Sequence, residues 1–345
     1  MEPTVSANAS FTHDRAAIIS VQAVEAPEIV TSDWIDEQLA PFYARWGVRP
    51  GLLAELAGIK ERRWWPEGFT FDQAAAAAGR QAIAVSGVDP SEIGMLISTS
   101  VCKHHLEPSV ACAVHHQLGL STACINFDLA NACLGFINAI HLASTAIDGG
   151  FIKYALIVDG EGSRHTQQAT IARLQGEGSM VTDMFDEFAS LTLGSGAAAM
   201  VLGSIDDHPD GHRIIGGMAR AATEHHTLCV GDLEKMTTDT KRLLEAGLDL
   251  ADVAWKDAAC EFDWANGMDH YILHQVSSVH TRMLCERLGI DPDKAPLTYP
   301  RYGNVGPAAI PITLAGVQDT IKRGERVLCM GIGSGLNTSL TEIVW

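Results

Sequence analysis

Cys133 lies where the sequence predicts that a strand ends and a helix begins. The apolar run 125–129 predicts the strand, and the small residues after Cys133 predict a helix that continues to about Asp148. The exposed backbone N–H groups and the helix dipole at such a junction stabilise a thiolate, which makes Cys133 a candidate nucleophile. A small cysteine that only packs among its neighbours is the commoner role, so position alone leaves both roles open.

Two further polar residues lie at a predicted strand end and in a predicted turn. His274 follows the apolar strand 271–273, and Asn304 lies between Gly303 and Gly306. Polar groups at the carboxyl ends of strands usually line a crevice, where they can bind a ligand. Taken singly, each residue also fits a structural role, as a histidine with satisfied hydrogen bonds or as a turn asparagine in a left-handed conformation.

The elements that must position these residues alternate between strand and helix. This alternation predicts an α/β fold with a largely parallel or mixed sheet and helices on its faces. We expect a mobile tail at residues 1–14 and two duplicated α/β halves, 15–190 and 191–345, with an irregular stretch at 164–190. The large apolar residues of that stretch fit either an acyl channel or a subunit contact; they are Met180, Met184, Phe185 and Phe188.

The composition is that of a soluble α/β enzyme. The chain has 345 residues, 47% of them hydrophobic and 19% charged. Its formal net charge of -18 opposes binding to nucleic acid or to an anionic membrane, so we expect neither partner and no membrane insertion. Eight cysteines without a C-x-x-C pair favour a reducing compartment, and the N-terminus lacks a secretory pattern, so we expect a cytoplasmic protein.

Neither a metal site nor a nicotinamide cofactor is expected. The histidine doublets at 104–105, 115–116 and 225–226 do not combine into the three or four ligands that a zinc site requires. The glycine-rich run 331–335 is only superficially similar to a dinucleotide fingerprint, because a strand rather than a helix is expected to follow it.

Taken together, the motifs resemble those of ketoacyl synthase III and its thiolase-fold relatives, in order and spacing over nearly the whole chain. They are Gly58-Ile59-Lys60-Glu61-Arg62-Arg63, Asn131-Ala132-Cys133-Leu134-Gly135-Phe136, Leu193-Gly194-Ser195-Gly196-Ala197, His274-Gln275, Gly303-Asn304 and Gly331-Ile332-Gly333-Ser334-Gly335. The resemblance implies a thiolase fold, in which two duplicated halves form a five-layered αβαβα core.

Within that superfamily the details are most similar to the OleA type, which condenses two long-chain acyl-CoA molecules head to head. Ketoacyl synthase III typically has His-Gln-Ala-Asn where this chain has His-Gln-Val-Ser, which weakens the fatty-acid-initiation alternative. The segments that carry the similarity are Leu106-Glu107-Pro108-Ser109, His274-Gln275-Val276-Ser277, Gly331-Ile332-Gly333-Ser334-Gly335-Leu336-Asn337 and Glu342-Ile343-Val344-Trp345.

The resemblance implies a role for each candidate residue. Cys133 takes the first acyl group from CoA as a thioester, while its own amide and the backbone near Ser334 hold the acyl oxygen. His274 and Asn304 donate hydrogen bonds to the second thioester carbonyl and stabilise its enolate. CoA thioesters are then the substrates, and no cofactor is needed.

Glu107 is the candidate base. A plain fatty acyl-CoA cannot form a carbanion by losing carbon dioxide, so its α-proton must be removed by a positioned base. Resemblance to the OleA type implies that Glu107 reaches this carbon from the neighbouring subunit of a homodimer. A carboxylate before Pro108 also fits a simple favourable interaction with a helix dipole, and the residues alone leave both roles open.

A basic and aromatic cluster is the candidate CoA-binding site. Lys60, Arg62, Arg63 and Trp64 lie together on an otherwise acidic chain, and such side chains suit phosphates and adenine. A solvated turn with half-buried indoles is the equal alternative.

Our leading hypothesis is a homodimeric acyltransferase that performs a non-decarboxylative Claisen condensation of two long-chain acyl-CoA molecules. Its product, a 2-alkyl-3-oxoacyl-CoA, feeds long-chain olefin or β-lactone biosynthesis, and a complex with downstream enzymes of that pathway is a further possible partner. The enzymatic alternative is a ketoacyl synthase III that joins an acyl-CoA to malonyl-acyl carrier protein. The alternative of another class is a catalytically silent subunit that binds acyl chains.

Overall fold

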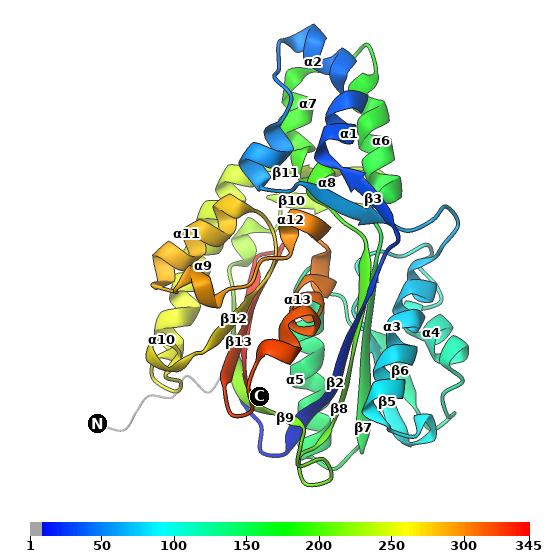
Figure 1. Cartoon of the computed structure of the whole chain (residues 1–345), viewed down its shortest axis with the longest axis vertical. Helices are drawn as coiled ribbons and strands as arrows, with labels where there is room; N and C mark the ends of the chain where they lie inside the picture. Colours follow the sequence, from blue (N-terminus) through cyan, green and yellow to red (C-terminus); the bar gives the residue numbers. More distant parts are fainter. Residues whose placement is uncertain (1–8) are drawn as a thin grey trace.

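Ten strands form one mixed sheet that runs through both halves of the molecule (Figure 1). The computed structural model describes residues 9–345, and in it the strand order is β12-β13-β14-β9-β2-β8-β7-β5-β6, with β1 paired to β9. β2 and β9 pair only at Ala17 with Arg213 and at Ile18 with His212, so two half-sheets meet at a narrow seam. The strands of this sheet are β1 (Ser10–Thr12), β2 (Ala16–Glu25), β5 (Ile93–Ser98), β6 (Ile125–Asp128), β7 (Tyr154–Glu161), β8 (Gly196–Ser204), β9 (His212–Ala221), β12 (His270–Leu273), β13 (Arg326–Gly333) and β14 (Asn337–Val344).

Helices cover the outer faces of both half-sheets and fill the space between them. α3 and α4 pack on the first half-sheet, α9 and α11 pack on the second, and α5 and α13 lie between the two (Figure 1). These layers agree with the α/β prediction and with the five-layered arrangement. The six helices are α3 (Phe71–Ser86), α4 (Val110–Leu118), α5 (Gly135–Asp148), α9 (Thr240–Ala258), α11 (Ser278–Leu288) and α13 (Ala309–Val317).

α3 packs closely on the end of β7 because small residues of the helix meet Gly160 of the strand. The helix begins with a capping box, in which the backbone N–H of Thr70 donates to the side chain of Gln73 at 3.0 Å. A Cβ on Gly160 would lie 2.2 Å from the carbonyl oxygen of Phe71, so only glycine fits at this point of β7. This contact fixes the carboxyl end of β7 close to the helix.

The structure differs from three sequence-based expectations. The predicted tail ends earlier than expected, because residues 10–12 form β1 and pair with β9; its first eight residues lie outside the described part of the chain. The predicted boundary at 190/191 is one strand too early, because β8 lies between β2 and β7 and completes the first half-sheet. The stretch 164–190 is helical rather than irregular, forming α6 (Arg164–Gln175), α7 (Val181–Asp186) and most of α8 (Phe188–Thr192).

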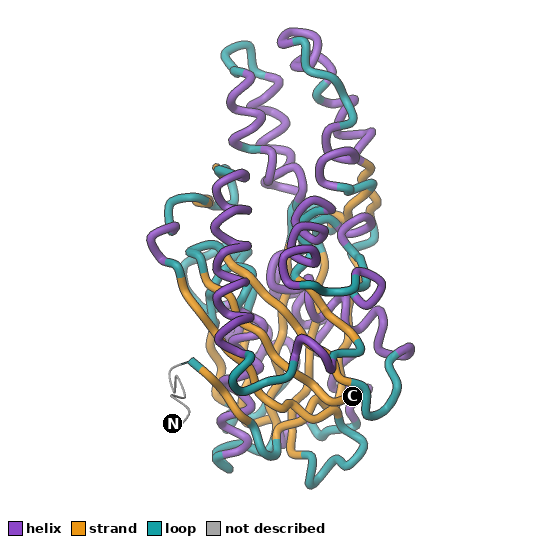
Figure 2. The backbone as a smooth tube through the Cα atoms, turned by 90° about the vertical axis from the view of Figure 1, so that its left-hand side faces the viewer, coloured by secondary structure: helices purple, strands orange, loops and turns teal. Residues whose placement is uncertain are grey.

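These three helices join α1 (Ser32–Gln38) and α2 (Ala40–Trp46) in a helical cap beyond one end of the sheets (Figures 1 and 2). The cap has its own apolar core, in which side chains from segments far apart in the sequence meet. Its members include Phe42, Leu174, Met184 and Leu191, all fully buried. The short strands β3 (Glu28–Thr31) and β4 (Glu61–Trp64) pair antiparallel at the base of the cap.

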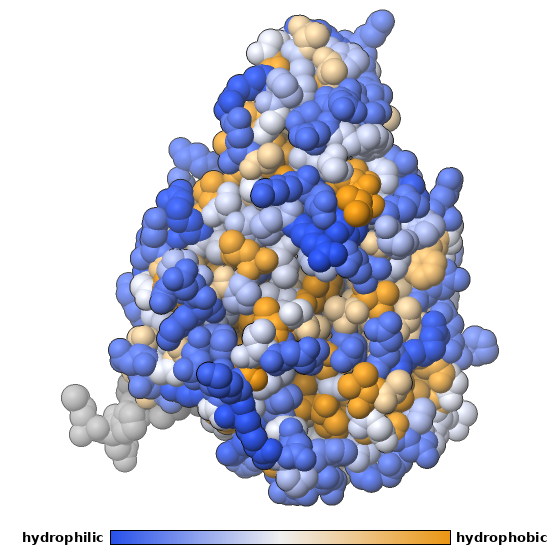
Figure 3. All heavy atoms as spheres, viewed as in Figure 1, coloured by the Kyte–Doolittle hydropathy of each residue, from blue (hydrophilic) through white to orange (hydrophobic). Residues whose placement is uncertain are grey.

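Hydrophilic residues cover most of the face that Figure 3 shows, and apolar residues gather in its lower half, over β2 and β8. None of the helices in residues 9–345 has the length and apolar character needed to cross a membrane.

Candidate active site

A cavity of about 1370 Å³ opens between the two half-sheets and the cap. The structure brings Cys133, His274, Asn304 and Ser334 together on its wall, as the sequence predicted. Much of the remaining wall is apolar, which suits an acyl chain better than a polar ligand. The apolar lining residues include Leu56, Phe185, Phe188, Leu228, Val230 and Leu244.

Cys133 lies in the turn between β6 and α5, as expected from the sequence. The preceding residue, Ala132, has a φ of +45°, a left-handed backbone conformation that residues other than glycine rarely adopt. The backbone N–H of Leu134 donates to the Asn131 carbonyl at 3.0 Å, which closes the turn just before the helix. The turn therefore directs the Cys133 side chain out of the helix and into the cavity wall.

The expected stabilisation of a Cys133 thiolate is not found. Burial raises the pKa of the Cys133 thiol to about 12, and negative charge at Glu161, Cys229 and Asp159 acts in the same direction. A hydrogen bond from the Cys133 backbone opposes these effects only partly. The resting residue is therefore a neutral thiol, which must lose its proton as it is acylated.

His274 presents a neutral imidazole to the cavity. Burial, followed by the proximity of His280, lowers the pKa of His274 to about 3. Its backbone N–H donates to Met330 at 2.9 Å, which fixes the residue to β13 beyond the end of β12. The buried Nδ1 of the ring has no hydrogen-bond partner among residues 9–345. A neutral imidazole can donate one N–H to a carbonyl oxygen at physiological pH.

His280 is a second imidazole on the same wall that sequence reasoning missed. It lies in the first turn of α11, where its backbone N–H donates to the Ser277 hydroxyl at 3.2 Å. Burial lowers its pKa to about 4, and no group in the described chain pairs with its buried Nδ1. The spacing of six residues from His274 is no known signature, so the sequence carried no signal for this pair.

The turn that contains Asn304 is held against the strand that the glycine motif begins. The Asn304 backbone N–H donates to Thr192 at 2.9 Å, and the Gly194 N–H donates to the Asn304 carbonyl at 2.8 Å. A Cβ on Gly194 would lie 1.7 Å from the Tyr302 carbonyl oxygen, so this approach requires glycine. The Asn304 side-chain oxygen accepts from the Gly306 N–H at 3.0 Å, which leaves its amide N–H groups to face the cavity.

Ser334 follows β13 and lies beside the turn that contains the nucleophile. A Cβ on the adjacent Gly333 would lie 3.0 Å from the Asn131 carbonyl oxygen, so the two backbones approach closely. This close approach places the Ser334 and Cys133 backbones on the same part of the cavity wall. The arrangement fits the predicted oxyanion hole formed by their amides.

Glu107 does not line the cavity of its own subunit. It lies in the loop 101–109, between β5 and α4, whose first residues, Val101, Cys102 and Lys103, do line the cavity. From residue 104 onward the loop turns outward, so that Glu107 is exposed and the side chain of Leu106 is fully so. Glu107 is therefore separated from Cys133, His274 and Asn304 of its own chain, which do line the cavity.

The predicted CoA-binding cluster is wrong for three of its four residues. Arg62 is fully buried, and its guanidinium donates to the Leu191 carbonyl at 3.1 Å and to the Ser32 hydroxyl at 3.2 Å. Arg63 and Trp64 are also buried, with Arg63 paired to glutamates of the same chain. These side chains hold β3, β4 and the cap together, so they cannot also bind phosphates.

Of that cluster, only Lys60 is exposed, and its contact with CoA stays a prediction because it does not line the cavity. Cations that do line the cavity are Lys103, Lys241 and Arg242, the last two at the start of α9.

Glu161 is another wall residue that sequence reasoning missed. It is the last residue of β7, which was predicted to end three positions earlier, at Val158. Burial raises the pKa of Glu161 to about 7, and burial likewise raises that of its neighbour Asp159 well above the usual range. Had the strand been predicted to end at residue 161, Glu161 would have been a candidate, because polar residues at the carboxyl ends of strands usually line crevices.

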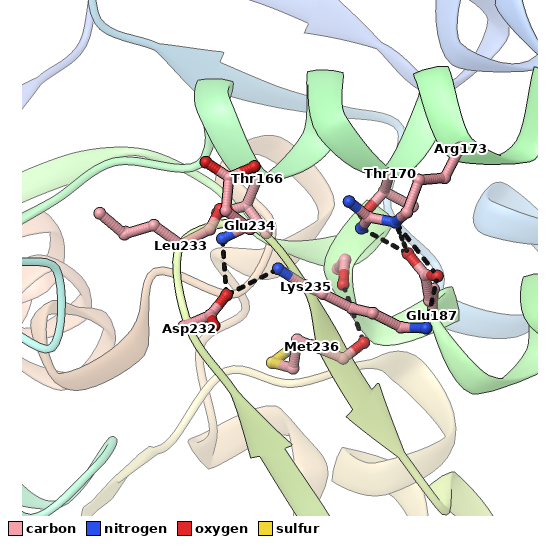
Figure 4. A network of polar contacts seen from close by, with 10 residues as sticks. Thr166, Thr170, Arg173, Glu187, Asp232, Leu233, Glu234, Lys235 and Met236 are labelled. Carbon is pink, nitrogen blue, oxygen red and sulfur yellow. Dashed lines mark hydrogen bonds and ion pairs between the residues drawn. The ribbon is translucent and has the colours of Figure 1, made fainter.

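One side of the cavity is closed by the hairpin of β10 (Cys229–Gly231) and β11 (Met236–Thr238), which is tied to the cap (Figure 4). The Thr166 hydroxyl of α6 donates to the Leu233 carbonyl at 2.8 Å. Glu187 pairs with Arg173 at 2.6 Å and with Lys235 of the hairpin at 3.5 Å. The hairpin is thereby fixed to α6 and α8 rather than free in solvent.

In the part of the chain that the structure describes, no group of three His, Cys, Asp or Glu side chains could hold a metal ion.

Two family models match the chain. The model described as 3-oxoacyl-[acyl-carrier-protein (ACP)] synthase III matches residues 127–220, and the model of its C-terminal part matches residues 265–345. The first match contains Cys133, and the second contains His274, Asn304 and Ser334.

Among curated relatives, the acyl-CoA:acyl-CoA alkyltransferase of Xanthomonas campestris is 40% identical over 95% of this chain and 98% of its own length. The enzyme of the same name from Shewanella oneidensis is 34% identical over 96% of this chain and 99% of its own. The β-ketoacyl-[acyl-carrier-protein] synthase III of Sodalis glossinidius is more distant, at 28% identity over 82% of this chain and 87% of its own.

Solved structures of Xanthomonas campestris OleA have the same fold. A cysteine-to-serine variant with bound lauric acid and lauroyl-CoA matches with a TM-score of 0.95 at 39% identity, covering 96% of this chain and all of that one. The cerulenin-bound protein matches equally well, over 97% of this chain and 98% of that one.

Proposed function

This chain belongs to the acyl-CoA:acyl-CoA alkyltransferase family of thiolase-fold condensing enzymes, and we propose that it condenses two long-chain acyl-CoA molecules at Cys133. The observation that supports this proposal most directly is a largely apolar cavity whose wall brings together Cys133, His274 and Asn304 from both half-sheets. The chain supplies every group that the reaction needs, with CoA thioesters as substrates and no resident cofactor.

The first half-reaction is acyl transfer to Cys133. Its sulfur attacks the thioester carbonyl, a new carbon–sulfur bond forms, and the bond to the CoA sulfur breaks. The Cys133 thiol proton leaves with the CoA sulfur, so that free CoA is released. The Cys133 and Ser334 amides stabilise the negative oxygen of the tetrahedral intermediate, which the close backbone approach at Gly333 permits.

The second half-reaction forms the carbon–carbon bond. A base removes the α-proton of the second acyl-CoA, and the enolate oxygen accepts hydrogen bonds from His274 and Asn304. The α-carbon then attacks the thioester on Cys133, the carbon–sulfur bond breaks, and the departing thiolate takes up a proton. The product is a 2-alkyl-3-oxoacyl-CoA, a precursor suited to long-chain olefin or β-lactone formation.

Glu107 is the proposed base, and it acts in the cavity of the neighbouring subunit of a homodimer. Its exposure and its absence from the wall of its own cavity support this arrangement. The fully exposed Leu106 beside it and the half-exposed Ile125 on the edge strand β6 support a covered surface, because large apolar side chains are enriched where subunits meet.

Such a dimer would act on its CoA thioesters in the cytoplasm, where it would pass its product to downstream enzymes, directly or in a complex. The chain has 42 acidic and 24 basic residues, and this excess of negative charge opposes binding to anionic membrane surfaces, which supports a location in the cytoplasm.

Incubating the purified protein with myristoyl-CoA alone tests the proposal. We expect free CoA and a β-keto product that contains both acyl chains, identified by mass spectrometry. A ketoacyl synthase III would form only the Cys133 adduct until a malonyl thioester was added, and a silent subunit would form no adduct; either outcome would contradict the proposal.

A further inference from the structure

Glu161 is a buried carboxylate on the cavity wall that the proposed steps do not use. Glu161 is only 5% exposed, whereas the three aspartates that line the same cavity, at positions 186, 232 and 239, are exposed to solvent. Burying a carboxylate is costly unless its oxygens receive strong hydrogen bonds, so the partners of Glu161 indicate what it does.

Both carboxylate oxygens of Glu161 hold the beginning of the loop 101–109. One accepts from the Val101 backbone N–H at 2.6 Å, and the other accepts from the Cys102 N–H at 3.3 Å. The Cys102 thiol also donates to the Gly162 carbonyl at 3.4 Å. The end of β7 thus fixes the two residues with which the loop leaves the cavity.

A second carboxylate, Asp128, holds the far side of the same loop. It accepts from the Val110 and Ala111 N–H groups at 3.1 and 2.9 Å, and it pairs with Lys103 at 2.9 Å. Residues 104–108 between these two anchors are all exposed, and they include Glu107. The direction in which Glu107 projects is therefore set by two carboxylates at the ends of β7 and β6.

Glu161 also lies next to the turn that contains Asn304. A Cβ added to Gly306 would come within 3.6 Å of the Glu161 carboxyl carbon, so little space separates the glycine from the carboxylate. The same carboxylate therefore lies between the loop 101–109 and the turn that presents an enolate-binding amide.

We propose that Glu161 is a positioning residue that holds the loop 101–109 in the geometry from which Glu107 removes the α-proton in the neighbouring subunit. This inference rests on the proposed function, and it concerns the second half-reaction only. Glu161 acts on condensation through the loop, whereas its only effect on acyl transfer is the smaller one of its charge on the Cys133 thiol.

The test separates the two half-reactions in Glu161→Gln. Glutamine keeps the size of the side chain, but its NH₂ group would face one of the two backbone N–H donors, so the loop loses an anchor. Acylation is followed as the mass increase of the protein after exposure to myristoyl-CoA. Condensation is followed after the pre-acylated enzyme receives a second portion of myristoyl-CoA, with rates normalised to the acylated fraction.

We expect acylation within about threefold of wild type and condensation slower by roughly tenfold to a hundredfold, the cost of a small misplacement of a reacting group. Asp128→Asn releases the other anchor and is expected to show the same selective loss. The matched control is Glu342→Gln, because Glu342 is a 4% exposed carboxylate that accepts from Trp264 and Arg326, both at 2.8 Å, outside the cavity wall. This control should slow neither step.

The inference is wrong if Glu161→Gln condenses at the wild-type rate, or if both of its steps slow in the same proportion. Those results differ from a failure of the proposed function, in which the wild-type protein itself forms no product from myristoyl-CoA alone. The condensation rate is expressed per acylated protein, so a partly unfolded variant can still be compared with wild type. Asp128→Asn tests the role of the loop independently of Glu161.

Discussion

Two pairs of buried histidines differ in their hydrogen bonds. In the anchor pair, His13 Nδ1 contacts Asp148 at 3.1 Å, His13 Nε2 contacts His141 at 3.2 Å, and His141 Nε2 contacts Thr341 at 2.8 Å. In the cavity pair, His274 and His280, neither buried Nδ1 has a partner within residues 9–345.

Burial lowers the pKa of all four imidazoles, so burial alone does not separate the pairs. Their hydrogen bonding does. A buried polar group without a partner costs free energy, so the two unpaired Nδ1 atoms do not serve stability, whereas both histidines line the cavity wall. We therefore expect a structural role for the anchor pair, in which His141 lies midway along α5 and His13 contacts Asp148, the last residue of that helix, and a functional role for the cavity pair.

The contrast predicts the largest effect for His274→Ala, which should impair catalysis. Removing one donor to the developing enolate oxygen should slow condensation by roughly a hundredfold or more. The unfolding midpoint in denaturant should change little, because the side chain has few partners to lose. Product formation from the pre-acylated enzyme measures the first effect, and equally fast condensation would break the contrast.

A stability effect is expected from the anchor pair. Burial lowers the pKa of His141 from its ordinary value of 6.5 to about 3 in the folded protein, so the unfolded state binds the proton first as pH falls. Stability is therefore present above about pH 6.5 and is lost as pH falls from there toward 3. Between pH 7 and 5 this histidine should account for about 2 kcal/mol of the lost unfolding free energy.

His141→Gln tests that expectation through urea unfolding at both pH values. The variant should be less stable than wild type at pH 7, lose less stability on acidification, and condense at nearly the wild-type rate per folded molecule. The anchor pair would not be purely structural if the unfolding free energy of the variant fell with pH as steeply as that of wild type, or if the variant lost condensation selectively.

The smallest effect is expected for His280→Leu. The unpaired Nδ1 of His280 contributes little to the stability of the folded state. An apolar side chain of similar size should therefore change the unfolding free energy by less than about 1 kcal/mol. Removing this imidazole from the cavity wall should slow condensation by roughly fivefold, the effect of one neutral hydrogen bond. A large loss of stability instead would assign His280 to the structural group.

The sequence was sufficient to place Cys133, His274 and Asn304 at strand ends or turns, but their proposed roles came from the resemblance of the motifs taken together. It was insufficient for Arg62, whose partner Leu191 is 129 positions away in the chain, so that nothing local reveals its burial. Glu161 was missed for a different reason: β7 remains buried to its last residue, and the predicted strand ended where its apolar residues ended.

Mixing two inactive variants tests the central claim most directly, namely that acyl-Cys133 in one subunit is condensed with the help of Glu107 from the other. Cys133→Ala retains Glu107, and Glu107→Gln retains a Cys133 that still acylates. After subunit exchange, a hybrid dimer has one site with both groups intact, so the mixture should form the β-keto product from myristoyl-CoA although neither variant does alone. A mixture that stays inactive despite exchange, or a Glu107→Gln enzyme that is active by itself, would contradict the account.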